Sequence, residues 1–262
     1  MIMPRTVAAL AALALLCGCA TTPRSKPDPR DRIEGFNRAM FRFNMAVDKA
    51  VVRPVARGYR VVTPTPVRRG IANFTSNLAY PQVIVADFLQ GKLGDGGRDL
   101  LRFTGNTVFG FGLFDPASRA GLDAHDEDFG QTLGRWGIGP GTYLVLPFLG
   151  PSTLRDAIGK VPDDYLRVSH YFHDPYARWG TVALERLEIR TQLLDTDRTI
   201  DTAYDPYAFV RNAWLARREY LIHDGNVPAE TEEPELPPDD IPPPDAAPPP
   251  VAPPAPPPSA SP

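Results

Sequence analysis

The sequence predicts an all-α fold, and two observations favour it. Apolar residues recur with helical spacing along residues 31–226. Several of these segments begin with an acid followed directly by proline, a pair that suits the N-cap and the first turn of a helix. Residues 31–226 are numerous enough to form a single helical domain with a core of its own. No apolar run approaches the roughly 20 residues that cross a bilayer as a helix.

Residues 1–18 have the pattern of a bacterial lipoprotein signal peptide. Arg5 precedes a run of ten apolar residues, which ends in Leu16-Cys17-Gly18-Cys19, a sequence that resembles a lipobox. We therefore expect Cys19 to become a lipidated N-terminus, where two acyl chains would anchor the protein stably. The alternative is an ordinary secretory signal that is cleaved elsewhere. Residues 19–30 would form a polar tether, and Ala20 after the cysteine favours the outer membrane.

Residues 227–262 form the opposite end of the chain and are predicted to be a disordered acidic tail. The stretch 228–262 contains 16 of the 31 prolines, seven acids and no base. Because the whole chain carries a net charge of −3, the rest carries +4 and is rich in arginine. Such a body suits anionic lipid headgroups but is not basic enough to indicate nucleic-acid binding.

The sequence pattern predicts five helical segments in the first half of the domain. In chain order they cover residues 31–48, 51–60, 66–78, 82–90 and 99–114. Prolines at positions 66 and 81 are expected to start the third and fourth. The last two are apolar nearly all round, as a buried or lipid-facing helix must be. Two interpretations stay open here: short helices that lie in the plane of one leaflet, or the core of a soluble domain.

Three Asp-Pro pairs mark helix starts in the rest of the domain. Asp115-Pro116 opens a short helix, Asp174-Pro175 opens one that reaches Leu194, and Asp205-Pro206 opens the last one, to Ile222. The two long helices have one apolar side and one charged side, which is typical of packing outside the membrane.

The densest stretch is 127–156, with the sequence EDFGQTLGRWGIGPGTYLVLPFLGPSTLRD. The five glycines between Gly130 and Gly141 suggest a phosphate-binding loop, but the Lys-Ser/Thr that such a loop requires is absent. The run that follows, residues 143–149, is apolar and interrupted by Pro147. The pattern favours a flexible, kinked hairpin beside an apolar surface.

Several motifs together resemble the MlaA/VacJ family of outer-membrane lipoproteins. They are EGFNRAMFRFN at 34–44, VRRGIANFTSNL at 67–78, EDFGQTLGRWGIG at 127–139 and YLVLPFLGPSTLRD at 143–156. Thr142 departs from the family pattern, which usually has proline there. The resemblance implies a ring-shaped domain, with short helices in the inner leaflet of the outer membrane and longer helices in the periplasm. It also implies a trimeric porin as partner and a central channel that passes misplaced phospholipids to a soluble periplasmic lipid carrier.

If the protein has such a channel, we expect particular side chains to line it and to gate it. The candidates for the polar lining of the lipid path are Asn44, Asn73, Asn77, Asn106 and Thr107. The candidates for a gating loop are Gly134, Gly137, Gly139 and Gly141. For Asn37, a role as a satisfied core amide is equally open.

Other chemistry lacks the residues it needs, so no catalytic residue, metal ligand or cofactor is predicted. No Gly-x-Ser-x-Gly elbow or Walker motif occurs, and both cysteines lie at or before residue 19. His170 and His173 have helical spacing without a third ligand, and His125 and His223 look isolated. Two rival functions remain, a structural envelope scaffold without a lipid path and a lipid hydrolase.

Overall fold

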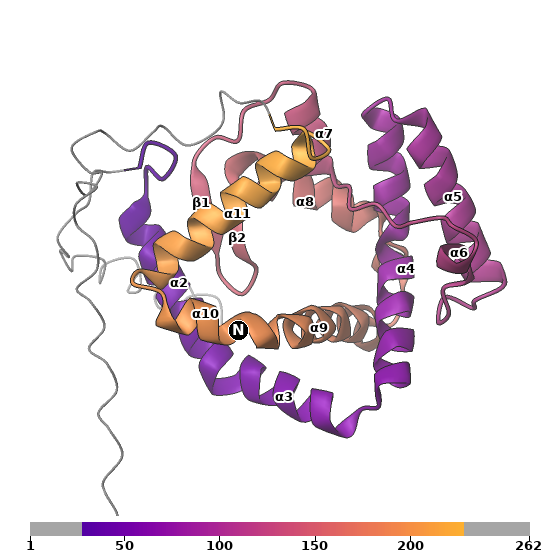
Figure 1. Cartoon of the computed structure of the whole chain (residues 1–262), viewed down its shortest axis with the longest axis horizontal. Coiled ribbons are helices and arrows are strands. Elements are labelled where there is room, and N and C mark those ends of the chain that lie inside the picture. The colour runs from indigo at the N-terminus through magenta and orange to yellow at the C-terminus, as the bar shows by residue number, and fades with distance from the viewer. Residues whose placement is uncertain (1–27, 228–262) are drawn as a thin grey trace, which may run out of the picture. The chain divides into compact units, whose positions relative to one another are not determined.

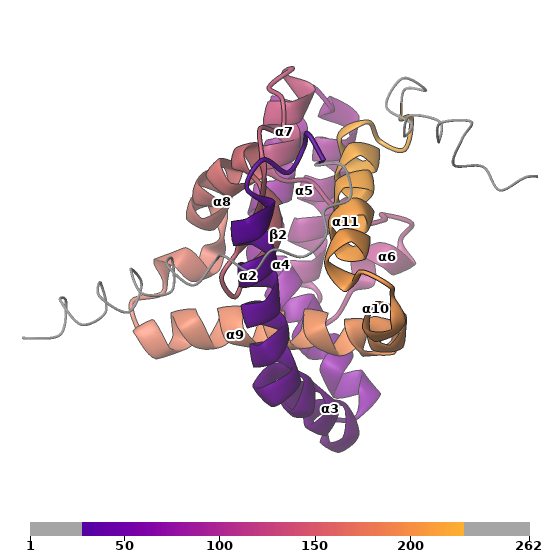
Figure 2. The ribbon, with the colours of Figure 1, turned by 90° about the vertical axis from the view of Figure 1, so that its left-hand side faces the viewer.

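The computed structural model describes residues 28–227, which are mostly helical (Figures 1 and 2). The elements are α2 (Glu34–Val47), η1 (Asp48–Val52), α3 (Arg53–Val62), α4 (Thr65–Leu89), α5 (Leu93–Val108), α6 (Pro116–Arg119), α7 (Phe129–Arg135), β1 (Tyr143–Leu146), β2 (Gly150–Thr153), α8 (Leu154–Leu166), η2 (Val168–Tyr171), α9 (Pro175–Gln192), η3 (Leu193–Thr196), α10 (Asp197–Thr202) and α11 (Pro206–Ile222). A mostly helical fold is therefore confirmed, and the all-α class is corrected by a two-stranded antiparallel sheet of β1 and β2, which lies in the stretch where the sequence favoured a kinked hairpin. Cys19 and the acidic tail lie outside the described residues.

The chain from Glu34 to Val62 is helical without a break and changes direction in the middle (Figure 1). The change falls at η1, a π-helical turn that ends two residues before Pro54. Proline lacks an N–H and its ring crowds the carbonyl four residues earlier. The wider π turn accommodates both effects and leaves α2 and α3 pointing in different directions.

A cluster of ion pairs fixes this bend to the later helices. Asp48 accepts hydrogen bonds from Arg190 of α9 at 2.6 and 2.9 Å and from Arg53 at 3.2 Å. Arg190 also reaches Asp197 of α10 at 2.6 Å. All four side chains are mostly buried, so their charges are compensated by one another rather than by water.

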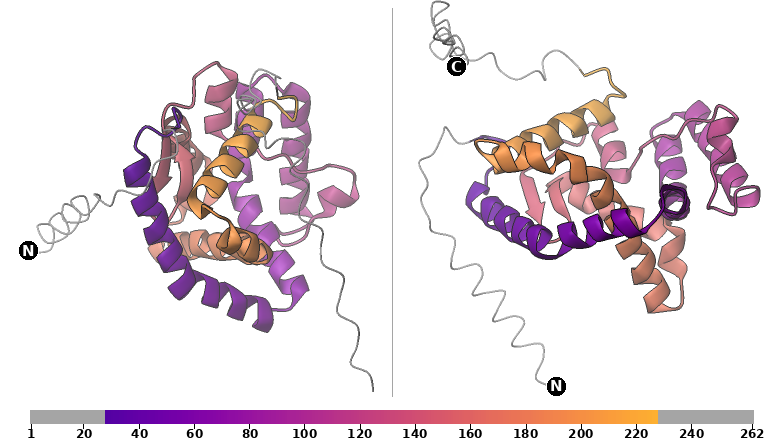
Figure 3. Two further views of the ribbon diagram at one scale, coloured as in Figure 1. Left: turned by 60° about the vertical axis from the view of Figure 1, so that its left-hand side comes forward. Right: turned by 60° about the horizontal axis from the view of Figure 1, so that its bottom comes forward.

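Helix α4 continues through Pro81, where the sequence had predicted a break and a new helix. The proline removes one helical hydrogen bond, so tertiary packing must stabilise the continuous helix. Tyr80, Val83 and Ile84 on either side of it form a buried apolar cluster against Phe103 of α5. Helix α4 also contacts α7, α8 and α9 along its length, and Figure 3 shows this helix from two further sides.

Helix α5 stops at Val108, six residues before the predicted end at Phe114. A Cβ at Gly110 would lie 2.4 Å from the Phe114 carbonyl oxygen, so the chain folds back tightly on itself here. Phe111 has a φ of +52°, a left-handed conformation that helices do not contain. The aromatic side chains of this turn stay largely exposed to the outside.

Two asparagines of α2, Asn37 and Asn44, form hydrogen bonds with the backbone of the hairpin, and we call this pair the amide clamp. Asn37 donates to the Tyr143 carbonyl at 2.9 Å and accepts from the Val145 N–H at 2.9 Å. Asn44 repeats the pattern two turns later, with the Leu146 carbonyl at 2.9 Å and the Phe148 N–H at 2.8 Å. Each amide thus acts as a short stretch of neighbouring strand. The clamp holds the hairpin on α2, and the open question about Asn37 is answered in favour of a buried, fully bonded amide.

The clamp predicts a graded loss of stability. Asn37→Ala should lower the free energy of unfolding by about 2–4 kcal/mol, because it leaves buried backbone groups of β1 without partners. Asn44→Ala should cost about 1 kcal/mol, because water can reach its partners. Chemical denaturation of the two variants in detergent measures the difference. Equal losses would contradict the clamp as described.

Candidate functional site

Two adjoining hollows lie along α4. The smaller, of about 30 Å³, holds little more than one water molecule and is lined by Asn73, Ser76, Asn77, Tyr80, Arg102, Asn106 and Asp115. The larger, of about 400 Å³, shares Asn73, Ser76 and Tyr80 with it and reaches α9 and the coil before α7. We call the larger one the α4–α9 cavity. Its further lining is Ala72, Thr75, Ala79, Gln82, Val83, Ala124, His125, Asp126, Glu185, Glu188, Ile189 and Gln192.

The structure brings together four of the five side chains that the sequence singled out for a lipid path. Asn73 donates to the Leu113 carbonyl at 3.0 Å, and Asn77 donates to the Thr107 hydroxyl at 2.9 Å. Asn106, next to Thr107 in α5, is buried and lines the smaller hollow together with Asn73 and Asn77. In residues 28–227 the amide oxygens of Asn73 and Asn77 accept no hydrogen bond, so both remain available to a donor in the hollow.

Asn44, the fifth candidate, lies elsewhere. It belongs to the amide clamp, and both of its polar side-chain atoms are bonded to the hairpin backbone. Its neighbour Phe43 packs edge-on against Phe148 at the hairpin tip, with ring centroids 5.2 Å apart. Asn44 therefore acts on the hairpin, away from the hollows along α4.

A buried ion pair closes the smaller hollow. Arg102 reaches Asp115 at 2.7 Å and also donates to Ser118 at 2.9 Å. Burial acts to raise the pKa of Asp115, but hydrogen bonds from Ser118, Arg102 and Asn106 outweigh it and lower the pKa to about 2. The pair stays charged at physiological pH, and it places a fixed dipole beneath Asn73 and Asn106.

Large apolar side chains are unusually exposed at the outer surface. Val61 and Val62 at the end of α3 are 84% and 76% exposed, and Phe111 in the turn after α5 is 77% exposed. Phe148 at the hairpin tip is 74% exposed. Exposed apolar groups on this scale indicate contact with a membrane or a partner protein. No helix in the described part of the chain is long and apolar enough to cross a membrane.

The four candidate gating glycines have different surroundings. Gly134 lies inside α7, where a Cβ would come within 2.9 Å of Arg155. Gly137 and Gly141 have φ values of +86° and +69°, which only glycine adopts without strain. Gly139 has open space around it. The exposed loop after α7 thus contains two obligatory glycines and one that is free of any steric demand.

Helices α7 and α8 hold the base of this loop through a close contact. A Cβ at Gly159 would lie 2.6 Å from the Gly130 nitrogen, so neither position tolerates a side chain. Asp128 caps α7 by accepting from the Gln131 N–H at 2.7 Å and pairs with Arg218 at 2.7 Å. Close packing and ion pairs therefore fix the base of the loop.

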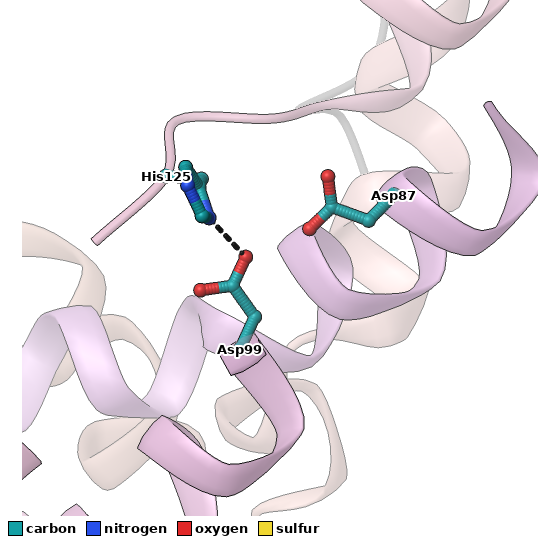
Figure 4. Close-up of side chains that lie close together, drawn as sticks. All are labelled: Asp87, Asp99 and His125. Atoms are coloured by element: carbon teal, nitrogen blue, oxygen red, sulfur yellow. Dashed lines mark hydrogen bonds and ion pairs between the residues drawn. The ribbon is translucent and has the colours of Figure 1, made fainter. Parts of the chain in front are cut away.

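One group of side chains was missed by the sequence reasoning. His125, predicted to be isolated, lies with its Nδ1 2.8 Å from Asp99 Oδ2, and Asp87 faces them both (Figure 4). Burial, and then the neighbouring acids Asp99 and Glu127, raise the pKa of Asp87 to about 8. The only hint in the sequence is an acid inside the apolar run 83–89, which is uncommon unless it has a partner.

The chain is similar to known lipoproteins over most of its length. The model of the MlaA lipoprotein family matches residues 29–221. The intermembrane phospholipid transport system lipoprotein MlaA of Escherichia coli is 40% identical over 241 residues, covering 88% of this chain and 96% of that protein. Its counterpart in Haemophilus influenzae is 32% identical over 246 residues, covering 89% and 94%.

A solved structure is also similar to this chain in both fold and sequence. It comes from work on the structural basis for maintenance of bacterial outer membrane lipid asymmetry, and it matches this chain with a TM-score of 0.68 at 39% identity. The match covers 76% of this chain and 100% of that one.

The junction of α7 and α8 predicts a pH-dependent stability. Asp163 accepts from the Phe129 N–H at 2.9 Å, and burial followed by the charge of Asp128 raises its pKa to about 6. Its neutral form stabilises the fold below about pH 4, and that contribution is lost as the pH rises through 6. Asp163→Asn should therefore gain up to about 3 kcal/mol over the wild type between pH 4 and pH 8. Unfolding of both proteins across this range provides the measurement, and parallel curves would contradict the assignment.

Proposed function

This chain belongs to the MlaA lipoprotein family, whose function is intermembrane phospholipid transport rather than catalysis, and we propose that it removes misplaced phospholipids from the outer leaflet of the outer membrane. It passes them through a channel to a soluble periplasmic lipid carrier and so maintains lipid asymmetry. The observation that carries the proposal is the α4–α9 cavity, whose wall mixes apolar and polar side chains as an amphipathic ligand requires.

The amides of α4 suit a phospholipid headgroup. Asn73 and Asn77 offer amide oxygens that accept no hydrogen bond within residues 28–227, and Ser76 lies between them. Ammonium and hydroxyl groups of lipid headgroups are donors that such oxygens bind. Val83 and Ile189 supply apolar wall for the first carbons of an acyl chain. Asn73 lines both hollows and Asn77 only the smaller one, so a lipid would meet polar and apolar surface across the two adjoining hollows.

A ring of elements around a channel is the architecture that we propose for the path. Contacts between neighbouring elements support it, because they close a circuit. Strand β1 contacts α2, β2 contacts α11, α11 contacts α7, α7 contacts α4, α4 contacts α9, and α9 contacts α3, which follows α2 through η1. A circuit of this kind has no need of a central apolar core.

Exposed apolar groups on short elements support a placement in the membrane. Side chains such as Val62, Phe111 and Phe148 would insert into the inner leaflet of the outer membrane, while α9 and α11 lie in the periplasm. The lipid anchor on Cys19 and a trimeric porin would hold the domain in that leaflet. This position lets a lipid move without exposing its tails, which would otherwise cost roughly 20 kcal/mol at about 0.8 kcal/mol per methylene.

The path can be tested by making its polar wall apolar. Asn73→Leu combined with Asn77→Leu removes both amides, so a headgroup would lose its acceptors. In cells that depend on this variant we expect several-fold more phospholipid in the outer leaflet, measured by a lipase-accessible or acylation-based assay. Asn226→Leu, at an exposed asparagine near the end of the described chain, is the matched control.

The rival functions give different results in the same cells. A scaffold without a lipid path predicts wild-type outer-leaflet lipid in the double variant, and no lipid attached to a photocrosslinker placed at position 73. A lipid hydrolase predicts lysophospholipid released by the purified protein. Either result, with normal amounts of the variant in the membrane, would overturn the proposal.

The gating role of the loop has a sharper test than removal of all its glycines. Gly139→Ala adds a methyl group into open space at ordinary φ, so it restricts the loop without straining it. If the loop gates the path, this variant should raise outer-leaflet phospholipid while its melting temperature stays within about 2 °C of wild type. Gly180→Ala, an equally open glycine in α9, is the control. Wild-type lipid levels in Gly139→Ala would argue against a moving loop.

A further inference from the structure

Three side chains from distant parts of the sequence converge at one end of α4. Asp87 comes from the last turn of α4, Asp99 from the second turn of α5 and His125 from the coil that leads to α7. One ligand atom from each lies within 4.8 Å of the other two. Figure 4 shows the two carboxylates and the imidazole turned toward a common point. We call these residues the Asp-Asp-His cluster.

The approach of α5 to α4 is what builds this cluster. Gly96 lies one turn before Asp99, and a Cβ there would come within 3.2 Å of the Asp87 Cβ. The absence of a side chain lets the helices come close enough to place one carboxylate against the other. The cluster thus depends on the packing of α4 on α5 and not on a local motif.

Asp87 is the member that the protein itself leaves unsatisfied. Its side chain is 1% exposed, and neither carboxylate oxygen has a hydrogen-bond partner within residues 28–227. Asp99 is fully buried but accepts from the Tyr80 hydroxyl at 2.6 Å and faces His125 Nδ1 at 2.8 Å. An unpartnered buried carboxylate is costly unless a cation or a proton joins it.

The nearby protein cations are already engaged. Lys92 binds Glu127 at 2.7 Å and also pairs with Asp224. Arg102 pairs with Asp115 and the Ser118 hydroxyl. Neither of them makes an ion pair with Asp87, so this carboxyl group requires either a bound cation or a proton.

We propose that the Asp-Asp-His cluster binds one divalent transition-metal ion, with zinc as the fitting ion. One carboxylate oxygen from each aspartate and an imidazole nitrogen form a mixed oxygen and nitrogen ligand set, which suits zinc and disfavours calcium or magnesium. Three protein ligands leave a fourth position for water. A charge of two on the ion neutralises both carboxylates.

The surroundings of His125 complete the site. Its side chain is 35% exposed and lines the α4–α9 cavity, so an ion has a route to the cluster and the fourth position has room for water. Tyr80, which donates to the other oxygen of Asp99, orients that carboxylate as outer partners of metal ligands commonly do. Ligands of a tetrahedral zinc lie about 3.3 Å apart, so small side-chain adjustments bring the three atoms into place.

A metal here would crosslink three segments at the wall of the cavity. The coil around His125 has no regular secondary structure and leads directly into α7. Binding would tie this coil to the ends of α4 and α5, so the metal acts as a structural link.

Zinc titration of the full-length, untagged protein in detergent tests the proposal. After treatment with a chelator, we expect the wild type to bind one zinc per chain and to gain about 5–10 °C in melting temperature at zinc concentrations well above the dissociation constant. Asp87→Asn and His125→Gln should each weaken zinc binding by at least tenfold and lose most of the thermal shift. His173→Gln, at an exposed histidine outside the cluster, should behave as the wild type.

The alternative to a metal is a proton shared by Asp87 and Asp99. It predicts no zinc-dependent shift in the wild type and a more stable Asp87→Asn variant. That outcome would overturn the proposal, as would an unchanged shift in His125→Gln or a lost one in His173→Gln. Each readout compares zinc-loaded with chelated samples of one variant, so a change in basal stability does not affect the comparison.

Discussion

The fold depends on polar contacts in its interior more than on an apolar core. Asn37, Gln131 and Asp99 are fully buried, and within residues 28–227 more polar or charged residues than apolar ones are buried. Burying such groups stabilises a fold only if each one has partners, and the loss of one partner is costly. The apolar side chains that this arrangement leaves outside are then available to lipid. The polar interior and the apolar outer surface thus have the same cause, which is that polar side chains occupy most of the buried positions.

The same constraint explains how a hairpin of two four-residue strands can persist in a helical protein. An isolated two-stranded hairpin is marginal in water. Here the amide clamp adds side-chain hydrogen bonds to one edge of β1, and Tyr143 and Val145 pack against Tyr207 on its buried face. The hairpin is therefore stabilised by helices α2 and α11 and fixes their relative positions in return.

The sequence predicted what is local and missed what depends on distant packing. The Asp-Pro pairs gave the starts of α6, α9 and α11, because a cap and a proline act within one turn. The continuity of α4 could not be predicted, since the packing of Tyr80, Val83 and Ile84 with Phe103 of α5 stabilises the helix around its proline. The same holds for the attachment of the hairpin to α2, which lies about 100 residues earlier in the chain.

The residues of the candidate site also differ in whether local sequence or distant packing determines their position. Asn73, Asn77, Asn106 and Thr107 lie together because the adjacent helices α4 and α5 carry them. Asn44 shares their chemistry, but its surroundings are set by the hairpin. Nothing in the sequence joins Asp87 to His125, because their meeting requires the close approach of α4 and α5 at Gly96.

The proline inside α4 has a consequence for the hollow beside it. Because Pro81 has no N–H, the main-chain carbonyl of Asn77, four residues earlier, receives no helical hydrogen bond from it. That oxygen belongs to a residue of the hollow's own wall. The lost hydrogen bond is a property of the backbone, so no exchange of the residue 77 side chain restores it.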